Sequence, residues 1–216
     1  MSAIAFTVLG YSLSWLELAG VLTGLAAVSL AAMGKVINFY IGLVNNVLYF
    51  IIFYQNQLYS MMLLQVVFFS LCCYGIYSWS KPNEQQKKLK ISLLKVHWRI
   101  VIGIIIIVAG LLWARLVVYF SELFPENIET PACPNIDALL TMASIAGQAL
   151  LTRKKLESWA LWMMIDASST VFYATLGLYF TAILYSVYFC IGTRAFFRWR
   201  KEYLLQTENR QQQIIC

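Results

Sequence analysis

The chain has 216 residues, of which 61% are hydrophobic and 12% are charged, and its mean hydropathy is +0.70. Soluble domains carry about a quarter charged residues, so this composition excludes a soluble globular protein and indicates an integral membrane protein. The net charge of +6 is therefore interpreted through the placement of the basic residues relative to the membrane, and we expect no nucleic-acid partner.

Seven stretches are long and apolar enough to cross a membrane, which takes about 20 mostly apolar residues. In chain order they are residues 15–33, 36–55, 58–79, 100–120, 136–152, 158–177 and 179–198. The first is not a secretory signal, because no basic residue precedes Trp15. We therefore expect an all-α integral membrane protein with seven transmembrane helices.

The charged residues segregate to the two sides of these spans. Of the 16 Lys and Arg residues, all except Arg115 fall on one side. The loops on the other side hold acidic residues, namely Glu17, Glu122, Glu126, Glu129 and Asp137. By the positive-inside rule the N-terminus is periplasmic and the C-terminus is cytoplasmic.

An internal repeat becomes visible when the sequence is shifted by 120 residues. The shift superimposes residues of like type, including Glu17 with Asp137, Lys35 with Lys155, Phe39 with Trp159, Asn46 with Asp166, and Trp79 with Trp199. Three spans repeat and a fourth lies between them, which predicts a 3+1+3 arrangement of two parallel three-helix repeats. Transporters use such repeats to bind substrate at their interface, although repetition for folding economy alone is the alternative.

This pattern divides the chain into four parts. Residues 1–81 form an N-terminal segment and the first repeat, and residues 82–135 form a basic cytoplasmic loop, the linker helix and an acidic external loop. Residues 136–201 form the second repeat, and residues 202–216 form a cytoplasmic tail.

The sixth span carries the strongest candidate for a binding site. At about 100° per residue, one face presents a stripe of Trp159, Trp162, Asp166, Thr170 and Tyr173. A carboxylate at mid-membrane depth costs at least ~2.5 to 3.5 kcal/mol, so Asp166 is not expected to face lipid. Trp159 is also compatible with an aromatic residue at the membrane surface.

Other spans supply matching faces. The repeat mate of the stripe on span two is Phe39, Gly42, Asn46, Phe50 and Phe53, with Asn45 and Tyr49 beside it. Spans three and seven add Gln65, Thr181, Tyr185, Tyr188 and Gly192, whereas Gly24, Ser168 and Ser169 are interpreted as helix-packing residues. Aromatic rings around a carboxylate favour a flat cation, and neutral polyols are also compatible.

Catalysis and metal binding find little support. The only histidine is His97, no hydrolase or metalloprotease motif is present, and the five cysteines are interpreted as packing residues, so we expect neither an enzyme nor a cofactor. Residues 87–99 are predicted to form a basic amphipathic helix on the inner leaflet. The polar segment 206–216 is predicted to be disordered.

The segments GLVNN, LYSMMLLQVVFF and YGIYSWS, together with LLTRKKLESWALWMMID, resemble the PnuC family of bacterial nicotinamide riboside transporters. The resemblance covers essentially the whole chain and implies a SWEET-like fold in the inner membrane. It also implies facilitated uptake of nicotinamide riboside, a vitamin, without ATP or a coupling ion, followed by trapping through a separate kinase. Family relatives are thought to carry thiamine or riboflavin, so thiamine or a sugar is the alternative substrate, and a non-transporting receptor or scaffold is the rival class.

One position departs from the family pattern. Where the family often has Asn after the Trp-x-x-Trp motif, this chain has Asp166. Our hypothesis is that Trp162 and the tyrosines stack on the ring, while Asp166, Asn46 and Gln65 hold ribose hydroxyls or the charge. The Ile-rich surface of residues 100–107 faces lipid or another subunit, which leaves a homo-oligomer open.

Overall fold

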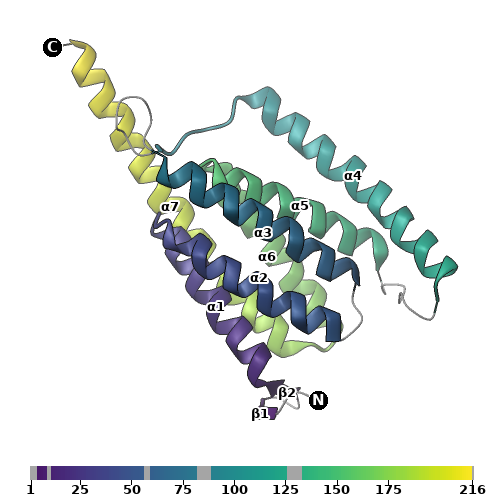
Figure 1. Cartoon of the computed structure of the whole chain (residues 1–216). Helices are drawn as coiled ribbons and strands as arrows, with labels where there is room; N and C mark the ends of the chain where they lie inside the picture. The colour runs from purple at the N-terminus through teal and green to yellow at the C-terminus, as the bar shows by residue number, and fades with distance from the viewer. Residues whose placement is uncertain (1–3, 9–10, 56–58, 82–88, 126–132, 216) are drawn as a thin grey trace.

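The computed structural model describes residues 4–8, 11–55, 59–81, 89–125 and 133–215, and within them it contains a short hairpin and seven helices (Figure 1). The elements are β1 (Ile4–Val8), β2 (Tyr11–Ser14), α1 (Trp15–Ala32), α2 (Ile37–Gln55), α3 (Tyr59–Ser80), α4 (Val96–Leu123), α5 (Pro134–Thr152), α6 (Glu157–Thr175) and α7 (Tyr179–Ile215). The first six helices coincide with the expected spans to within a few residues at each end.

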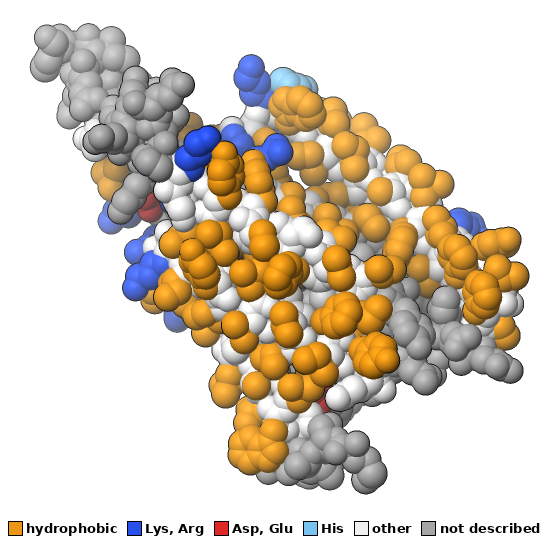
Figure 2. Space-filling model, in the orientation of Figure 1, with side chains coloured by type: hydrophobic (Ala, Val, Ile, Leu, Met, Phe, Trp, Pro, Cys, Tyr) orange, Lys and Arg blue, Asp and Glu red, His pale blue; other side chains and the backbone are white. Residues whose placement is uncertain are grey.

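The chain is a multi-pass membrane protein. Five helices, α1, α2, α3, α4 and α7, are long and apolar enough to cross a bilayer within the described residues. Figure 2 shows hydrophobic side chains spread over the flank of the bundle, while most of the visible Lys and Arg side chains gather toward the end where α7 leaves it. Helices α5 and α6 are less hydropathic because they carry more hydroxyl, amide and acidic residues.

The hairpin at the N-terminus is an addition to the all-α architecture that the sequence predicts. Strands β1 and β2 pair antiparallel, with Val8 opposite Tyr11. The second strand runs directly into α1 through a capping box, in which the Glu17 backbone N–H donates to Ser14 Oγ (3.2 Å) and the Ser14 N–H donates to Glu17 Oε2 (2.8 Å). The reciprocal bonds fix the point at which the helix begins.

Six helices surround a central space and one lies outside it. Helices α1, α2 and α3 pack in sequence order as a first triplet, and α5, α6 and α7 do the same as a second triplet. The triplets meet where α3 packs on α5 and where α1 packs on α7, whereas α4 packs on the outside of α5 (Figure 1).

The turn between α1 and α2 and the turn between α5 and α6 have the same backbone hydrogen bonds, 120 residues apart. In the first turn Gly34 N–H donates to Ala31 and Lys35 N–H to Leu30, at 2.8 and 3.0 Å. In the second turn Lys154 N–H donates to Leu151 and Lys155 N–H to Leu150, at 2.9 and 3.0 Å. Gly34 and Lys154 both have a positive φ, of 70° and 48°, so the two turns share one backbone conformation.

A cluster of buried hydrophobic residues lies at the end of the bundle where the Lys and Arg side chains gather, which we call the basic end. Trp79 near the end of α3 and Trp199 in α7 belong to it, together with Ala31, Phe39, Cys72, Ile91, Leu151, Leu156, Trp159 and Ala195. The Trp79 indole N–H donates to the Thr152 carbonyl (3.0 Å), and the Trp199 indole N–H donates to the Ala32 carbonyl (3.2 Å). The last residues of α1 and α5 are thus held at the same end, so these two helices run in the same direction.

The predicted disorder of the C-terminal tail is wrong. Helix α7 continues as far as Ile215, and Leu204 and Leu205 are exposed on its extension. No Gly or Pro follows Gly192, and Glu, Gln, Leu and Arg are strong helix formers. Polarity in this segment reflects solvent around a helix that extends beyond the membrane, not the loss of the helix.

The predicted amphipathic helix over residues 87–99 is wrong for residues 89–95. Residues 89–95 are not helical, and α4 begins only at Val96. Ser92 instead forms a parallel bridge with Lys155. Backbone hydrogen bonds to the α5–α6 turn replace those that a helix would supply, and residues 82–88 lie outside the described residues.

Candidate functional site

A cavity of about 960 Å³ lies between the two triplets. All six helices of the triplets contribute to its lining, and α4 contributes no described residue to it. Its size is at the upper end of the range for pockets that enclose small molecules. The cavity reaches from Glu17, in the first turn of α1, to Ala31 beside the basic end, so it extends over most of the height of the bundle.

The structure brings together nearly all the residues singled out from the sequence. The cavity is lined by Asn45, Asn46, Tyr49, Gln65, Trp159, Trp162, Asp166, Tyr173, Tyr185 and Tyr188. Thr170 is absent from the lining, and its hydroxyl donates to the backbone carbonyl of Asp166 (2.8 Å). Phe39 and Phe50, from the matching stripe on α2, are also absent from it. The part that these side chains play in binding stays a prediction.

Asp166 lies on the cavity side of α6 with 5% of its surface exposed. Gly192 of α7 lies beside it, since a Cβ built there would be in ordinary van der Waals contact with Asp166 Oδ2, at 4.0 Å. Among the described lining residues there is no Lys, Arg or His. The cavity therefore offers a buried carboxylate without a lining cation, which suits a positively charged ligand.

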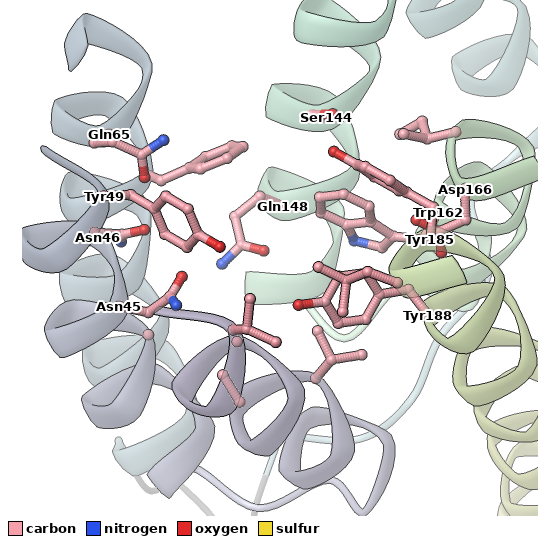
Figure 3. A pocket seen from close by; sticks show the side chains of 18 of the residues that line it. Asn45, Asn46, Tyr49, Gln65, Ser144, Gln148, Trp162, Asp166, Tyr185 and Tyr188 are labelled. Carbon is pink, nitrogen blue, oxygen red and sulfur yellow. The ribbon is translucent and has the colours of Figure 1, made fainter. Parts of the chain in front are cut away.

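Aromatic side chains form one wall of the cavity. The rings of Tyr173 and Tyr185 stack at 5.3 Å, and Tyr188 meets Tyr185 edge-on at 6.1 Å. Figure 3 shows Trp162, Tyr185 and Tyr188 on the side of Asp166, facing a polar wall of Asn45, Asn46, Tyr49 and Gln65. The cavity thus presents aromatic faces on one side and mainly amide side chains on the other.

The amide side chains differ in what already binds them. Asn45 Nδ2 donates to the Gly20 carbonyl (2.7 Å) and to Thr23 Oγ1 (2.9 Å), so its donors are used in joining α2 to α1. Asn46 Nδ2 and Gln148 Nε2 both point at Cys72 Sγ, at 3.6 and 3.7 Å. Because a thiol is a weak acceptor, these two amides keep most of their hydrogen-bonding capacity for a ligand.

Sequence reasoning missed two polar residues of α5. Ser144 and Gln148 line the cavity and stand between its two walls (Figure 3). Their repeat mates are Gly24 and Val28, so the repeat carries no polar signal at these positions. The spacing of Thr141, Ser144 and Gln148, three and then four residues apart, marks a polar face on this helix and was the available signal.

Gly24 has a different role from the helix packing that the sequence suggested. It lines the cavity, and a Cβ there would lie 2.7 Å from the Tyr188 hydroxyl oxygen. The missing side chain makes room for a cavity residue on α7. Ser168, by contrast, lines a shallow groove on the outer face of α6, and Ser169 is buried.

Trp159 is not a membrane-surface residue, since only 2% of it is exposed. It lies at the basic end of the cavity and meets Trp199 edge-on, with ring centroids 5.6 Å apart. Its indole nitrogen is buried and has no hydrogen-bond partner among the described residues. Buried polar groups are paired as a rule, so this N–H is an unused donor on a residue that lines the cavity.

Comparison with known proteins identifies the family. The family model described as "Nicotinamide mononucleotide transporter" matches residues 14–201. The nicotinamide riboside transporter PnuC of Escherichia coli is 35% identical over 195 residues, which cover 82% of each chain. The chain belongs to the PnuC family. Its PnuC relatives in Haemophilus influenzae and Neisseria mucosa are 26% and 24% identical and cover 87% of this chain, with 80% and 73% of their own lengths.

A solved structure supports the same fold. The crystal structure of the vitamin B3 transporter PnuC superimposes with a TM-score of 0.64 at 22% identity, covering 88% of this chain and 82% of that one. All of these relatives are named as transporters.

Proposed function

We propose that this PnuC-family protein carries nicotinamide riboside across the bacterial inner membrane by facilitated diffusion. The observation that carries the proposal is the cavity between the two triplets. Aromatic rings and Asp166 line it, and its described lining contains no Lys or Arg. The pyridinium ring of the riboside is flat and positively charged, so it is complementary to both features.

The charge of the cavity favours the riboside over the mononucleotide that the family description names. A phosphate group carries up to two negative charges and is normally bound by Arg, Lys or helix N-termini. Here the ionisable lining residues include the acids Glu17 and Asp166, and the lining contains no basic residue in the described part of the chain. A phosphate in this cavity would therefore be buried without a counter-charge.

Within the cavity we assign roles by chemistry. Trp162 and the tyrosines stack on the ring, Asp166 pairs with its charge or accepts ribose hydroxyls, and Asn46 and Gln65 bind the ribose. Gln148 joins them, because its amide points toward the same space as that of Asn46.

Transport by alternating access requires two bundles that move against each other. We infer a 3+1+3 arrangement of parallel repeats with seven membrane spans, in which α4 is the linker. The matching turns of the two triplets and the common direction of α1 and α5 support it. The basic end of the bundle is cytoplasmic by the positive-inside rule, which puts the N-terminus in the periplasm.

Proteoliposomes containing the purified protein test the proposal. Labelled nicotinamide riboside is expected to enter until the inner and outer concentrations are equal, without ATP or an ion gradient. Enclosing a nicotinamide riboside kinase with ATP should then raise the accumulated label further. Nicotinamide mononucleotide, thiamine and sucrose serve as competitors, and preferential uptake of thiamine or sucrose would replace the substrate, whereas uptake of none would favour a receptor.

A further inference from the structure

The connection that leads into α4 crosses the turn between α5 and α6. We call residues 89–95 the strap. Ser92 N–H donates to the Lys154 carbonyl and Leu156 N–H donates to the Ser92 carbonyl, both at 3.1 Å, and Lys155 Nζ donates to Ser92 Oγ at 2.9 Å. The strap therefore pairs with the turn as a short piece of sheet.

Two further contacts tie the strap and α4 to the start of α6. Glu157 Oε1 accepts a hydrogen bond from Leu94 N–H (2.9 Å) and forms an ion pair with Arg99 Nη2 of α4 (2.8 Å). Ile91 of the strap is 6% exposed and belongs to the buried cluster at the basic end. The contacts connect the strap, α4 and the beginning of α6 into one unit, and α4 also packs along α5.

The first triplet has no equivalent of the strap in the described part of the chain. Its turn makes backbone hydrogen bonds within α1 and α2. Among the described residues, the hydrogen bond from Trp199 to the adjoining Ala32 carbonyl is the only one that reaches it from another helix, and Ala32 and Val36 also pack against the buried cluster. Ile37, at the start of α2, is 50% exposed, whereas its mate Glu157 is bonded to the strap and to Arg99. The two turns share one backbone conformation, but within the described residues only the α5–α6 turn is bonded to the strap.

We propose that the strap fixes the turn of the second triplet to α4, so that the basic end of the cavity opens by displacement of the first triplet's turn alone. The proposal rests on the alternating access proposed above. The cluster around Trp79 and Trp199 lies across this end. Through its two indole hydrogen bonds it connects the α5–α6 turn, which the strap binds, to the α1–α2 turn, which the strap does not bind. A moving part needs few restraining contacts, and the first turn has fewer of them.

Distances between spin labels test this asymmetry in the full-length protein in lipid nanodiscs. One label pair joins Met33 to its mate Arg153 across the closed end, and the other joins Leu93 of the strap to Arg153 within the proposed static unit. All these positions are exposed, and the native cysteines are replaced in a background that retains uptake. We expect the Met33–Arg153 pair to show a second, longer population that changes with nicotinamide riboside, and the Leu93–Arg153 pair to keep one narrow distribution.

Three results would overturn the inference. They are a Leu93–Arg153 distance that changes together with Met33–Arg153, a change in Leu93–Arg153 alone, and a constant Met33–Arg153 distance in protein that still transports. Uptake by the same preparation is measured in liposomes, so a wrong substrate appears as absent uptake of the riboside. In that case the distance distributions of the substrate-free protein still show which turn moves.

A variant links the asymmetry to the strap itself. Glu157→Ala removes the acceptor for both Leu94 and Arg99, and Glu202→Ala removes an exposed acid on α7 as a matched control. The first substitution should broaden the Leu93–Arg153 distribution and the control should leave it narrow. A narrow distribution in Glu157→Ala would show that the strap does not hold the turn.

Discussion

Trp79 and Trp199 lie 6.1 Å apart, ring centroid to centroid, and each bonds to the opposite triplet. Trp79 of the first triplet reaches the last residue of α5, and Trp199 of the second triplet reaches the last residue of α1. A shift of 120 residues turns one contact into the other. The same shift relates the edge-on pair Phe39–Trp79 to the edge-on pair Trp159–Trp199, both at an interplanar angle of 83°. The two tryptophans and their contacts are thus related by a local two-fold pseudosymmetry.

We predict that Trp79→Phe and Trp199→Phe destabilise the protein to a similar extent. Each removes an N–H and leaves a helix-terminal carbonyl without that donor, at a cost of about 1–3 kcal/mol where the carbonyl is buried. Thermal unfolding in detergent measures the effect, and Trp98→Phe, at a residue 52% exposed, is the control and should change little. A loss confined to one of the two variants would contradict the reciprocal arrangement.

Hydropathy predicted the helices well because burial in lipid imposes the same apolar requirement on every span. The strap could not be predicted in this way. The basic, periodic pattern of residues 89–95 fits an amphipathic helix, but their backbone N–H groups bind Lys154 and Glu157, which are remote in sequence. Tertiary contacts therefore decided a conformation that local pattern left open.

The candidate site was predictable where the repeat supplied a second copy of the signal. Asn46 and Asp166 are mates, and both line the cavity. Gln148 was missed because its mate, Val28, is apolar and the repeat has diverged at this position. The structural use of Asn45 was equally hidden, since it depends on the approach of α1.

Asp166→Asn should weaken binding of nicotinamide riboside more than tenfold, which corresponds to about 1.4 kcal/mol. The substitution keeps the size and hydrogen-bonding oxygen but removes the charge that complements the pyridinium. The neutral dihydro form of the riboside provides the control ligand, since its binding should change far less. Titration calorimetry on both ligands measures this, with Glu202→Gln as the control variant. Equal losses for the two ligands would show that Asp166 does not act through charge.

Trp159→Phe should separate binding from stability. The Trp159 indole N–H has no partner among the described residues, so Trp159→Phe loses ring volume but no hydrogen bond and should lower the unfolding temperature less than Trp199→Phe does. If the N–H bonds the substrate, affinity falls by about three- to tenfold, the equivalent of a neutral hydrogen bond of about 0.5–1.5 kcal/mol. Trp199→Phe provides the contrast, because its N–H is already bonded and its loss should reduce stability. Unchanged affinity in Trp159→Phe would remove this residue from the binding site.

Gly75→Ala should destabilise the bundle because α3 packs closely on α2 at this point. An added Cβ would overlap the ring of Phe39, which is completely buried and has little room to move. Overpacking of this kind costs about 1–3 kcal/mol. Gly103→Ala in α4 is the matched control, because a Cβ there meets nothing within 4 Å, and its stability should be unchanged or slightly increased since Ala favours helix. Thermal unfolding of the two variants side by side measures the difference, and equal midpoints would mean that the α2–α3 contact is looser than the structure has it.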